Sequence, residues 1–359
     1  AYNLDPQEAV NYVEKHDNET LWDWMHRPDA LPTDMTIANR VRVNSLTNSI
    51  PLLSQGVPFI HMGSDLLRSK SMAPDSYNAG DWFNVVDFTK QTNNWGVGLP
   101  PGLRNGVTDP MVMALFANPN TKPTANHIAQ ASAVFDEFLS IASGSPLFSL
   151  QTAEEVNDRV GFHDGGKTQV AGLIVMSIDD GVGTVGETEV ARADLDSNVD
   201  AIVVVINGSA STQTPLVKTA SGFVLHSIQQ NSADAVVRTA SFAAADGGGN
   251  FSVPAYTTAV FVKPQSGAQG AGLSATASLG STSVVPYGDT AVYVRGEVSA
   301  AGWDATAANR MTYEGDGVYS VLLNVPAGTH IFKIAEANWS SPNLGSNQTI
   351  SIGGSLTLA

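Results

Sequence analysis

Apolar residues in the first part of the chain recur at helical spacing in two segments. Over Thr33–Gln55 they fall three and four positions apart, Thr33 or Asp34 supplies an N-cap, and Gly56 provides a stop. A second set with the same spacing extends over residues 125–143 and ends at a glycine. The pattern therefore predicts two amphipathic helices, each long enough to bury one face.

Short apolar runs precede both predicted helices. Val10–Val13 and Val57–His61 are rich in residues that favour strands, and an irregular stretch over 64–123 separates the second run from the second helix. This order of strand, loop and helix is that of two successive units of a (β/α)8 barrel. Residues 1–159 fall short of the ~250 residues of a whole barrel, so we expect only part of one.

From residue 160 onward the pattern changes to short alternating strands separated by Gly, Asn, Asp and Ser, which is typical of antiparallel sheets. The predicted strands are Gln169–Ile178, Ala201–Asn207, Gly222–Leu225 and Ala259–Val262, followed by Thr290–Arg295, Gly317–Val325 and His330–Ala335. A Gly-, Gln- and Ser-rich stretch between the two sets reads as a flexible linker. We therefore expect an antiparallel β-sandwich domain at 160–264, a linker at 265–283 and a small β-sandwich at 284–359.

The composition argues against several classes of partner and site. The formal charge of −16, from 34 acidic and 18 basic residues, argues against nucleic acid, because phosphates need a cationic surface. The chain has no cysteine, which excludes disulfides and thiolate metal ligands. No apolar run approaches the ~20 residues of a membrane span, so we expect no membrane-spanning helix in this chain. No His or carboxylate cluster has metal-ligand spacing, so we expect no cofactor. We interpret Asp179-Asp180 and the acidic residues of 194–196 as solvated turns.

A polar motif follows the first predicted strand, and further polar and aromatic motifs follow the second. These segments are Val13-Glu14-Lys15-His16-Asp17-Asn18-Glu19-Thr20, Val57-Pro58-Phe59-Ile60-His61-Met62-Gly63, Leu67–Asn84 and Asn94-Trp95-Gly96-Val97-Gly98-Leu99-Pro100-Pro101. Together they closely resemble the last quarter of the catalytic barrel of the pullulanase-type α-1,6-glucosidases, which debranch starch and pullulan. The resemblance implies that residues 1–159 are the last β/α units of a (β/α)8 catalytic barrel.

The resemblance also assigns roles to the first motif. It implies that Asp17 accepts hydrogen bonds from the sugar beside the cleaved bond and stabilises the transition state, and that His16 donates to the same sugar. A carboxylate near a developing cationic centre contributes electrostatically without forming a covalent bond. Asn18 either orients Asp17 and so helps to bind substrate, or forms a local Asx-type turn.

Two groups that this chemistry requires are missing from the sequence. A retaining glycosidase needs a nucleophilic carboxylate and an acid/base carboxyl group. In the family these groups follow earlier barrel strands, and this chain has neither a Gly-Phe-Arg-Phe-Asp-like nor a Gly-Glu-Gly-Trp-like segment. We therefore expect the chain alone to be inactive and to need the N-terminal part of the same protein as its partner.

The long loop after the second strand resembles the substrate loop of the family. Arg68 and Asp81 are expected to contact glucosyl units further from the cleaved bond, through charged hydrogen bonds to hydroxyl groups. The alternatives are a buried ion pair for Arg68 and a loop cap for Asp81. Trp95 either stacks on a sugar or packs in the core, whereas Trp82 and Phe83 are expected to pack beneath the loop.

The two β-rich blocks carry weaker functional signals. Residues 160–264 resemble the C-terminal domain of the family, which we expect to support the barrel. Residues 284–359 look more loosely like the small carbohydrate-binding-like modules of amylases and pullulanases. Trp303 and Trp339 lie in turns with Gly or Ser neighbours, where each indole either stacks on a glucan or packs.

The resemblance therefore implies part of a secreted, cell-surface or periplasmic bacterial debranching enzyme. By resemblance, this enzyme hydrolyses α-1,6-glucosidic bonds in pullulan, amylopectin or limit dextrins with retention, and its ligands are α-glucan polysaccharides or oligosaccharides. Calcium, where the parent protein uses it, is expected in segments outside this chain. Two alternatives stay open: a non-catalytic α-glucan-binding protein built on a barrel remnant, and an α-amylase-superfamily hydrolase of other bond specificity.

Overall fold

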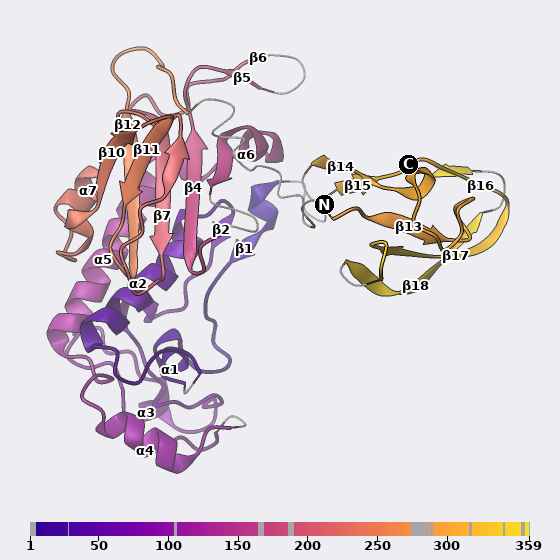
Figure 1. The fold of residues 1–359 in the computed structure, drawn as a ribbon. Coiled ribbons are helices and arrows are strands. Elements are labelled where there is room, and N and C mark those ends of the chain that lie inside the picture. Colours follow the sequence, from indigo (N-terminus) through magenta and orange to yellow (C-terminus); the bar gives the residue numbers. More distant parts are fainter. Residues whose placement is uncertain are drawn as a thin grey trace. The chain divides into compact units, whose positions relative to one another are not determined.

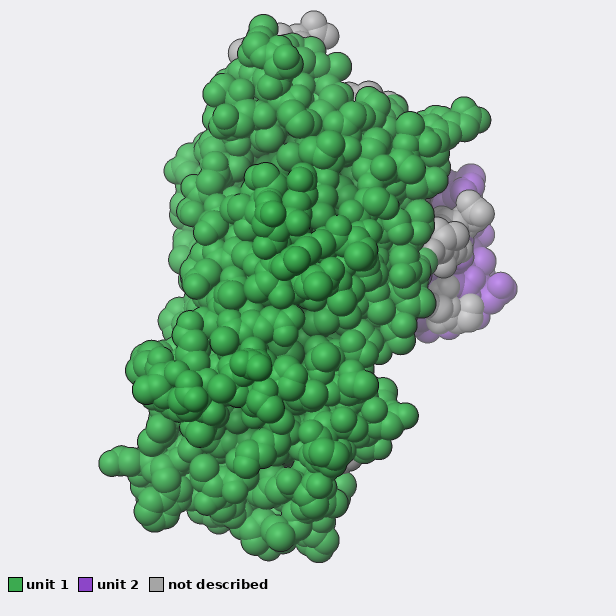
Figure 2. Space-filling view, turned by 90° about the vertical axis from the view of Figure 1, so that its left-hand side faces the viewer, with its two compact units in different colours: residues 1–164, 170–279 green, residues 165–169, 280–359 purple. Residues whose placement is uncertain are grey.

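The computed structural model of the chain divides into two compact units (Figure 2). Unit 1 contains residues 1–164 and 170–279, and unit 2 contains residues 165–169 and 280–359. Within them the structure describes residues 5–27, 29–103, 106–163, 169–185, 190–273, 287, 290–315, 318–339, 342–352 and 356–358.

Unit 1 begins with a mainly helical half (Figure 1). Its strands and α-helices are β1 (Val10–Asn11), α1 (Leu21–Met25), α2 (Ile37–Leu53), β2 (Val57–Pro58), α3 (Asp81–Asn84), α4 (Asp109–Ala117), α5 (Ala125–Gly144) and α6 (Ala153–Arg159). β1 and β2 pair in parallel, and α2 packs against α5. Both long helices match the predicted ones, whereas α3 and α4 lie in the stretch 64–123 that the pattern predicted as irregular.

Helix α2 begins later than the sequence indicated. Its N-cap is Thr36, whose hydroxyl oxygen accepts a hydrogen bond from the Asn39 backbone N–H at 3.3 Å. The predicted caps, Thr33 and Asp34, lie in the preceding turn. The reason is that the buried Arg40 guanidinium binds the carbonyl groups of that turn, which holds it outside the helix.

The second half of unit 1 is antiparallel β-structure. Its elements are β3 (Val160–His163), β4 (Leu173–Asp179), β5 (Thr184–Val185), β6 (Val190–Ala191), β7 (Val199–Asn207), β8 (Leu216–Lys218), β9 (Val224–Leu225), α7 (Ser227–Gln230), β10 (Ser241–Ala245), β11 (Gly248–Ser252) and β12 (Thr257–Pro264). The largest sheet has the order β3-β4-β7-β12-β9, and a smaller sheet has the order β10-β11-β8.

The centre of the larger sheet is covered on both faces (Figure 1). Val203 and Val205 of β7 join a core with Phe251 of the smaller sheet, while Ile202 and Val204 join a core with side chains of α2 and α5. Every residue of β7 is buried, which explains its long apolar run. Residues 1–159 and 160–264 therefore share one core through this sheet.

Unit 2 is formed by short antiparallel strands. They are β13 (Tyr293–Gly296), β14 (Thr312–Gly315), β15 (Val318–Ser320), β16 (Leu323–Val325), β17 (Gly328–Ala335), β18 (Asn343–Ile352) and β19 (Leu356–Leu358). β13, β17 and β18 form one sheet, and β14–β15 and β16–β19 form pairs. The single strand predicted for Gly317–Val325 is divided in two, because β15 and β16 pair with different partners. The antiparallel character predicted for both β-rich blocks is confirmed.

Candidate functional site

A buried carboxyl group holds the loop that follows β1. Glu14 is 8% exposed, and its two oxygens accept hydrogen bonds from the Leu21 backbone N–H, at 2.5 Å, and from the Ser64 hydroxyl group. His61 Nδ1 lies 3.8 Å from Glu14 Oε2. Since Ser64 and His61 follow β2, Glu14 joins the loops after the two parallel strands.

His16 and Asp17 lie on the exposed side of this loop. Their side chains are 82% and 60% exposed, and His16 Nε2 lies 3.4 Å from Asp17 Oδ1. Lys15 Nζ lies 2.6 Å from the other oxygen of Asp17. The hydrogen bond from Lys15, followed by the charges of His16 and Lys15, holds the pKa of Asp17 below its ordinary value. Asp17 is thus an ionised hydrogen-bond acceptor at neutral pH. Asn18 has a φ of 64°, as an Asx-type turn permits.

A second buried carboxyl group lies in helix α1. Asp23 is fully buried and accepts hydrogen bonds from the Ser69 hydroxyl at 2.5 Å and the Lys70 backbone N–H at 2.7 Å. Burial raises the pKa of Asp23 to about 6. The Lys70 ammonium group in turn donates to the His16 carbonyl oxygen at 3.4 Å. Asp23 therefore fixes the start of the long loop against α1, and that loop supports the backbone of the His16–Asp17 turn.

Arg68 and Asp81, the predicted substrate contacts, both belong to the long loop. Arg68 is partly buried, and its guanidinium group donates to the Asn84 carbonyl oxygen at 2.9 Å and lies 3.3 Å from His61 Nε2. Asp81 is exposed and is the first residue of α3. These contacts of Arg68 hold the long loop together. Among the described residues no ion pair between Arg68 and a carboxylate is seen, so both the substrate contact and the buried ion pair stay predictions.

The aromatic residues of the loop are distributed differently from the prediction. Trp95 is 5% exposed, and its ring packs against His26 and Phe116 at centroid distances of 4.7 and 5.2 Å. This placement favours the packing alternative for Trp95. Phe83 is buried as predicted, but Trp82 is 61% exposed, so the expectation that Trp82 packs beneath the loop is wrong. Its carbonyl oxygen accepts a hydrogen bond from the Asn94 side chain, and its ring centroid lies 6.1 Å from that of Phe83.

The predicted glucan-binding residues of unit 2 lie together. Trp303 and Trp339 are 40% and 39% exposed, and their ring centroids are 6.1 Å apart. The sequence placed each indole in a turn but gave no signal that the two turns meet.

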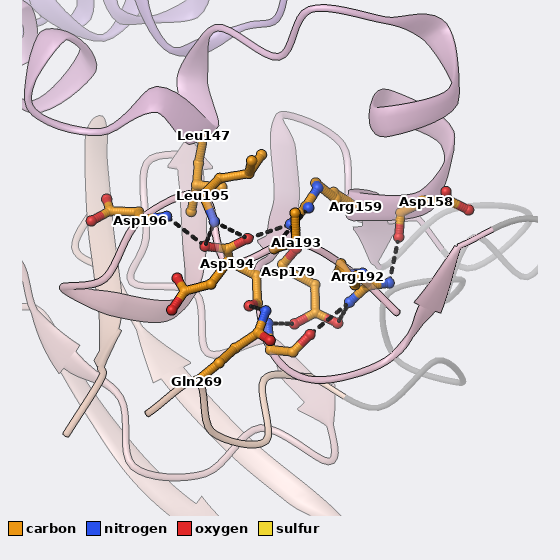
Figure 3. A network of polar contacts seen from close by, with 12 residues as sticks. Leu147, Asp158, Arg159, Asp179, Arg192, Ala193, Asp194, Leu195, Asp196 and Gln269 are labelled. Carbon is orange, nitrogen blue, oxygen red and sulfur yellow. Dashed lines mark hydrogen bonds and ion pairs between the residues drawn. The ribbon is translucent and has the colours of Figure 1, made fainter. Parts of the chain in front are cut away.

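The acidic pair at the end of β4 is buried, which contradicts its interpretation as a solvated turn. Asp179 and Asp180 are 1% and 0% exposed. Figure 3 shows the network of polar contacts around Asp179. Arg192 Nη1 lies 2.7 Å from Asp179 Oδ2, and Arg159 forms an ion pair with Asp180. Burial raises the pKa of Asp180, which also accepts hydrogen bonds from the backbone N–H groups of Leu195 and Asp196. This network closes one end of the β-structure and leaves these carboxylates without a solvated face.

The described residues offer no group of three or more His, Cys, Asp or Glu side chains that could hold a metal ion. Among the same residues, no helix is both long enough and apolar enough to cross a membrane.

Glu14, Asp23 and Lys70 are residues of this region that sequence reasoning missed. A local signal existed for Asp23, because Thr20 and Asp23 have the spacing of a capping motif at the start of a helix, and Thr20 does cap α1 at 3.2 Å. Glu14 and Lys70 gave no such signal, since their partners are 7 to 54 residues away in the chain.

Comparisons with known proteins connect this region to one family. Residues 90–264 match the family model of the C-terminal part of the pullulanase-type α-1,6-glucosidases. The chain is 41% identical over 270 residues to pullulanase 1, chloroplastic, of Arabidopsis thaliana, covering 74% of this chain and 27% of the plant protein. It is 39% identical over 272 residues to a pullulanase of Klebsiella pneumoniae, covering 76% and 24%. The chain spans about a quarter of the length of these curated relatives.

Solved structures give the same result. A crystal structure of Klebsiella pneumoniae pullulanase complexed with maltotriose superimposes with a TM-score of 0.63 at 37% identity, covering 75% of this chain and 24% of that one. The pullulanase PulA of Klebsiella oxytoca gives a TM-score of 0.64 at 37% identity, with coverage of 75% and 24%.

Proposed function

Because this chain belongs to the pullulanase-type α-1,6-glucosidases, as a C-terminal portion of such a protein, we propose that it supplies Asp17 and its loop to the active site. This active site hydrolyses α-1,6-glucosidic bonds. The substrates are pullulan, amylopectin or limit dextrins, and the reaction retains the anomeric configuration. The parallel pair β1–β2, with α2 between its strands, supports the view that residues 1–159 are the last units of a (β/α)8 barrel. We also propose that the parent protein is secreted, on the cell surface or periplasmic.

The observation that carries the proposal is an ionised carboxylate on a fixed loop. Asp17 follows the carboxyl end of β1, where barrel enzymes place their catalytic groups. Glu14 anchors the loop, and the hydrogen bond from Lys15 holds the pKa of Asp17 below its ordinary value. Asp17 can therefore accept hydrogen bonds from sugar hydroxyls and stabilise positive charge that develops at the anomeric carbon. His16, which is 82% exposed, donates to the same sugar.

The chemistry at the cleaved bond requires groups from elsewhere. One carboxylate must attack the anomeric carbon, and one carboxyl group must protonate the leaving oxygen. Neither assignment fits Asp17, whose role is electrostatic. We therefore attribute both groups to the N-terminal part of the same protein, and Asn18 and Asp81 to substrate binding beside them. The chain alone then shows no turnover of pullulan.

The test uses the complete protein with Asp17→Asn, assayed by release of reducing ends from pullulan. The substitution keeps the shape of the side chain and removes its charge, so we expect kcat to fall ~10²- to 10³-fold. Asp246→Asn is the matched control, because Asp246 is an exposed aspartate of the distant β10–β11 hairpin. A kcat for Asp17→Asn within twofold of the control would refute the proposed electrostatic role of Asp17. Turnover of pullulan by the isolated chain would refute the attribution of the nucleophile and the acid to the N-terminal part.

A further inference from the structure

A buried lysine contacts the backbone of the His16–Asp17 turn. Lys70 is only 3% exposed. Its ammonium group donates to the His16 carbonyl oxygen at 3.4 Å, and within the described part of the chain this is its only hydrogen bond. A buried ammonium group is costly unless nearby groups compensate its charge. The position of Lys70 therefore calls for a reason beyond packing.

The segment that carries Lys70 is held in a strained conformation. Leu67, Ser71 and Met72 have φ values of 55°, 54° and 64°, in the left-handed region that residues with side chains rarely adopt. All three are buried. Asp23 holds the middle of the segment by accepting a hydrogen bond from the Lys70 backbone N–H at 2.7 Å. Such strain persists only where surrounding contacts impose it, and it is concentrated at functional positions. The fold thus determines where this ammonium group lies.

Three buried carboxyl groups compensate the charge of Lys70. Burial lowers the pKa of Lys70, and the charge of Arg68 acts in the same direction. The carboxylates of Asp23, Glu19 and Glu14 act in the opposite direction. All three are buried, and they belong to α1 and to the loop between β1 and α1. These charges favour the protonated ammonium group in a place where burial alone would disfavour it.

Two lysines act on the Asp17 carboxylate from different positions. The hydrogen bond from Lys15 is the main cause of the lowered pKa of Asp17, and the charge of Lys70 contributes in the same direction. The Lys15 side chain is 39% exposed, so water and salt screen its charge and the side chain is free to move away. Lys70 is buried, so its charge is screened less and stays in place when a ligand covers Asp17.

We infer that Lys70 is a positioning residue for Asp17, because its ammonium group fixes the His16 carbonyl and supplies a lasting positive charge on the protein side of the turn. Its effect on catalysis rests on the proposed function, in which Asp17 stabilises the transition state. Lys70 acts through the turn and is distinct from Asn18 and Asp81, to which substrate binding is attributed.

The contact is tested by NMR on the full chain labelled with carbonyl-¹³C histidine and ¹⁵N aspartate. In the sequence only His16–Asp17 and His163–Asp164 join these two residue types, so the second peptide is an internal reference. Lys70→Met keeps a side chain of similar length and removes both the donor and the charge. We expect it to shift the His16–Asp17 signal and to leave the reference signal in place. Lys218→Met, which changes an exposed lysine of β8, should shift neither.

The role in catalysis is tested with the complete protein and pullulan. A misplacement of about 1 Å at a reacting centre costs up to ~10²-fold in rate, so Lys70→Met should lower kcat ~10- to 10²-fold. KM should change little, because the role of Asp17 is in the transition state. Lys70→Gln keeps an N–H donor for the His16 carbonyl and should recover part of kcat. A thermal midpoint measured for each variant separates this effect from unfolding.

Two results overturn the inference. One is a His16–Asp17 signal that Lys70→Met leaves unshifted. The other is a kcat of folded Lys70→Met within twofold of that of Lys218→Met, or a change in KM alone. Failure of the proposed function is recognised separately, since it appears as an unchanged kcat in Asp17→Asn, whereas the NMR comparison of Lys70→Met does not depend on activity.

Discussion

Replacing Glu14 by Ala should destabilise unit 1 more than any loop substitution without buried partners. The carboxyl group is 8% exposed and satisfies two buried donors, the Leu21 N–H and the Ser64 hydroxyl. Leaving a buried donor without an acceptor costs about 1–3 kcal/mol, so the pair amounts to about 3–4 kcal/mol. For a unit of this size, that loss lowers the thermal midpoint by roughly 10 °C. Differential scanning calorimetry of the chain measures it directly.

Glu14→Gln separates the hydrogen bonds of Glu14 from its charge. The amide oxygen can still accept from the Leu21 N–H, and the amide nitrogen can donate to the Ser64 oxygen, which is both donor and acceptor. We therefore expect Gln to cost less than about 1 kcal/mol. Glu154→Ala, an exposed carboxylate in α6, serves as the surface control. If Glu14→Ala shifts the midpoint no more than Glu154→Ala, the idea that a buried acceptor fixes this loop is incorrect.

Three further predictions concern charged groups of unit 1. Lys15→Ala should raise the pKa of Asp17 toward its ordinary value, because the hydrogen bond from Lys15 is the main cause of its depression; NMR titration of the carboxyl carbon would show no change if the contact were absent in solution. Burial raises the pKa of Asp23 to about 6, so its native state retains a proton that the unfolded chain loses above about pH 4. The contribution of Asp23 to stability is thus complete below pH 4 and falls by up to about 3 kcal/mol as the pH rises through 6. Asp23→Asn should flatten the fall in denaturation midpoint between pH 4 and 7, and an unchanged slope would contradict the assignment. Arg42→Ala should cost about 3–5 kcal/mol by leaving the buried Asp234 carboxylate, 3.1 Å away, unpaired; a loss below 1 kcal/mol in urea unfolding would show that the pair contributes little.

Local patterns in the sequence determined the elements that build the core. The helical spacing over Thr33–Gln55 and 125–143 predicted α2 and α5, because burying one face of a helix imposes that period. The apolar run over Ala201–Asn207 predicted a strand, and the structure shows that β7 is buried on both faces. The motif around His16 and Asp17 indicated the family, because a motif is recognised from the order of its residues and not from their contacts in the folded protein.

Only the tertiary structure decided which side chains face one another. The sequence does not reveal that Asp179 pairs with Arg192, or that Trp95 lies against His26 rather than a sugar. Arg295 reaches both Trp303 and Trp339 because β13 and β17 pair in antiparallel register. The periodicity of apolar residues shows which face of a helix or strand is buried. Which residues contact that face, or join two turns, depends on how segments distant in the sequence pack together. That packing converts exposed-looking acids into buried ion pairs, and two separate turns into one aromatic surface.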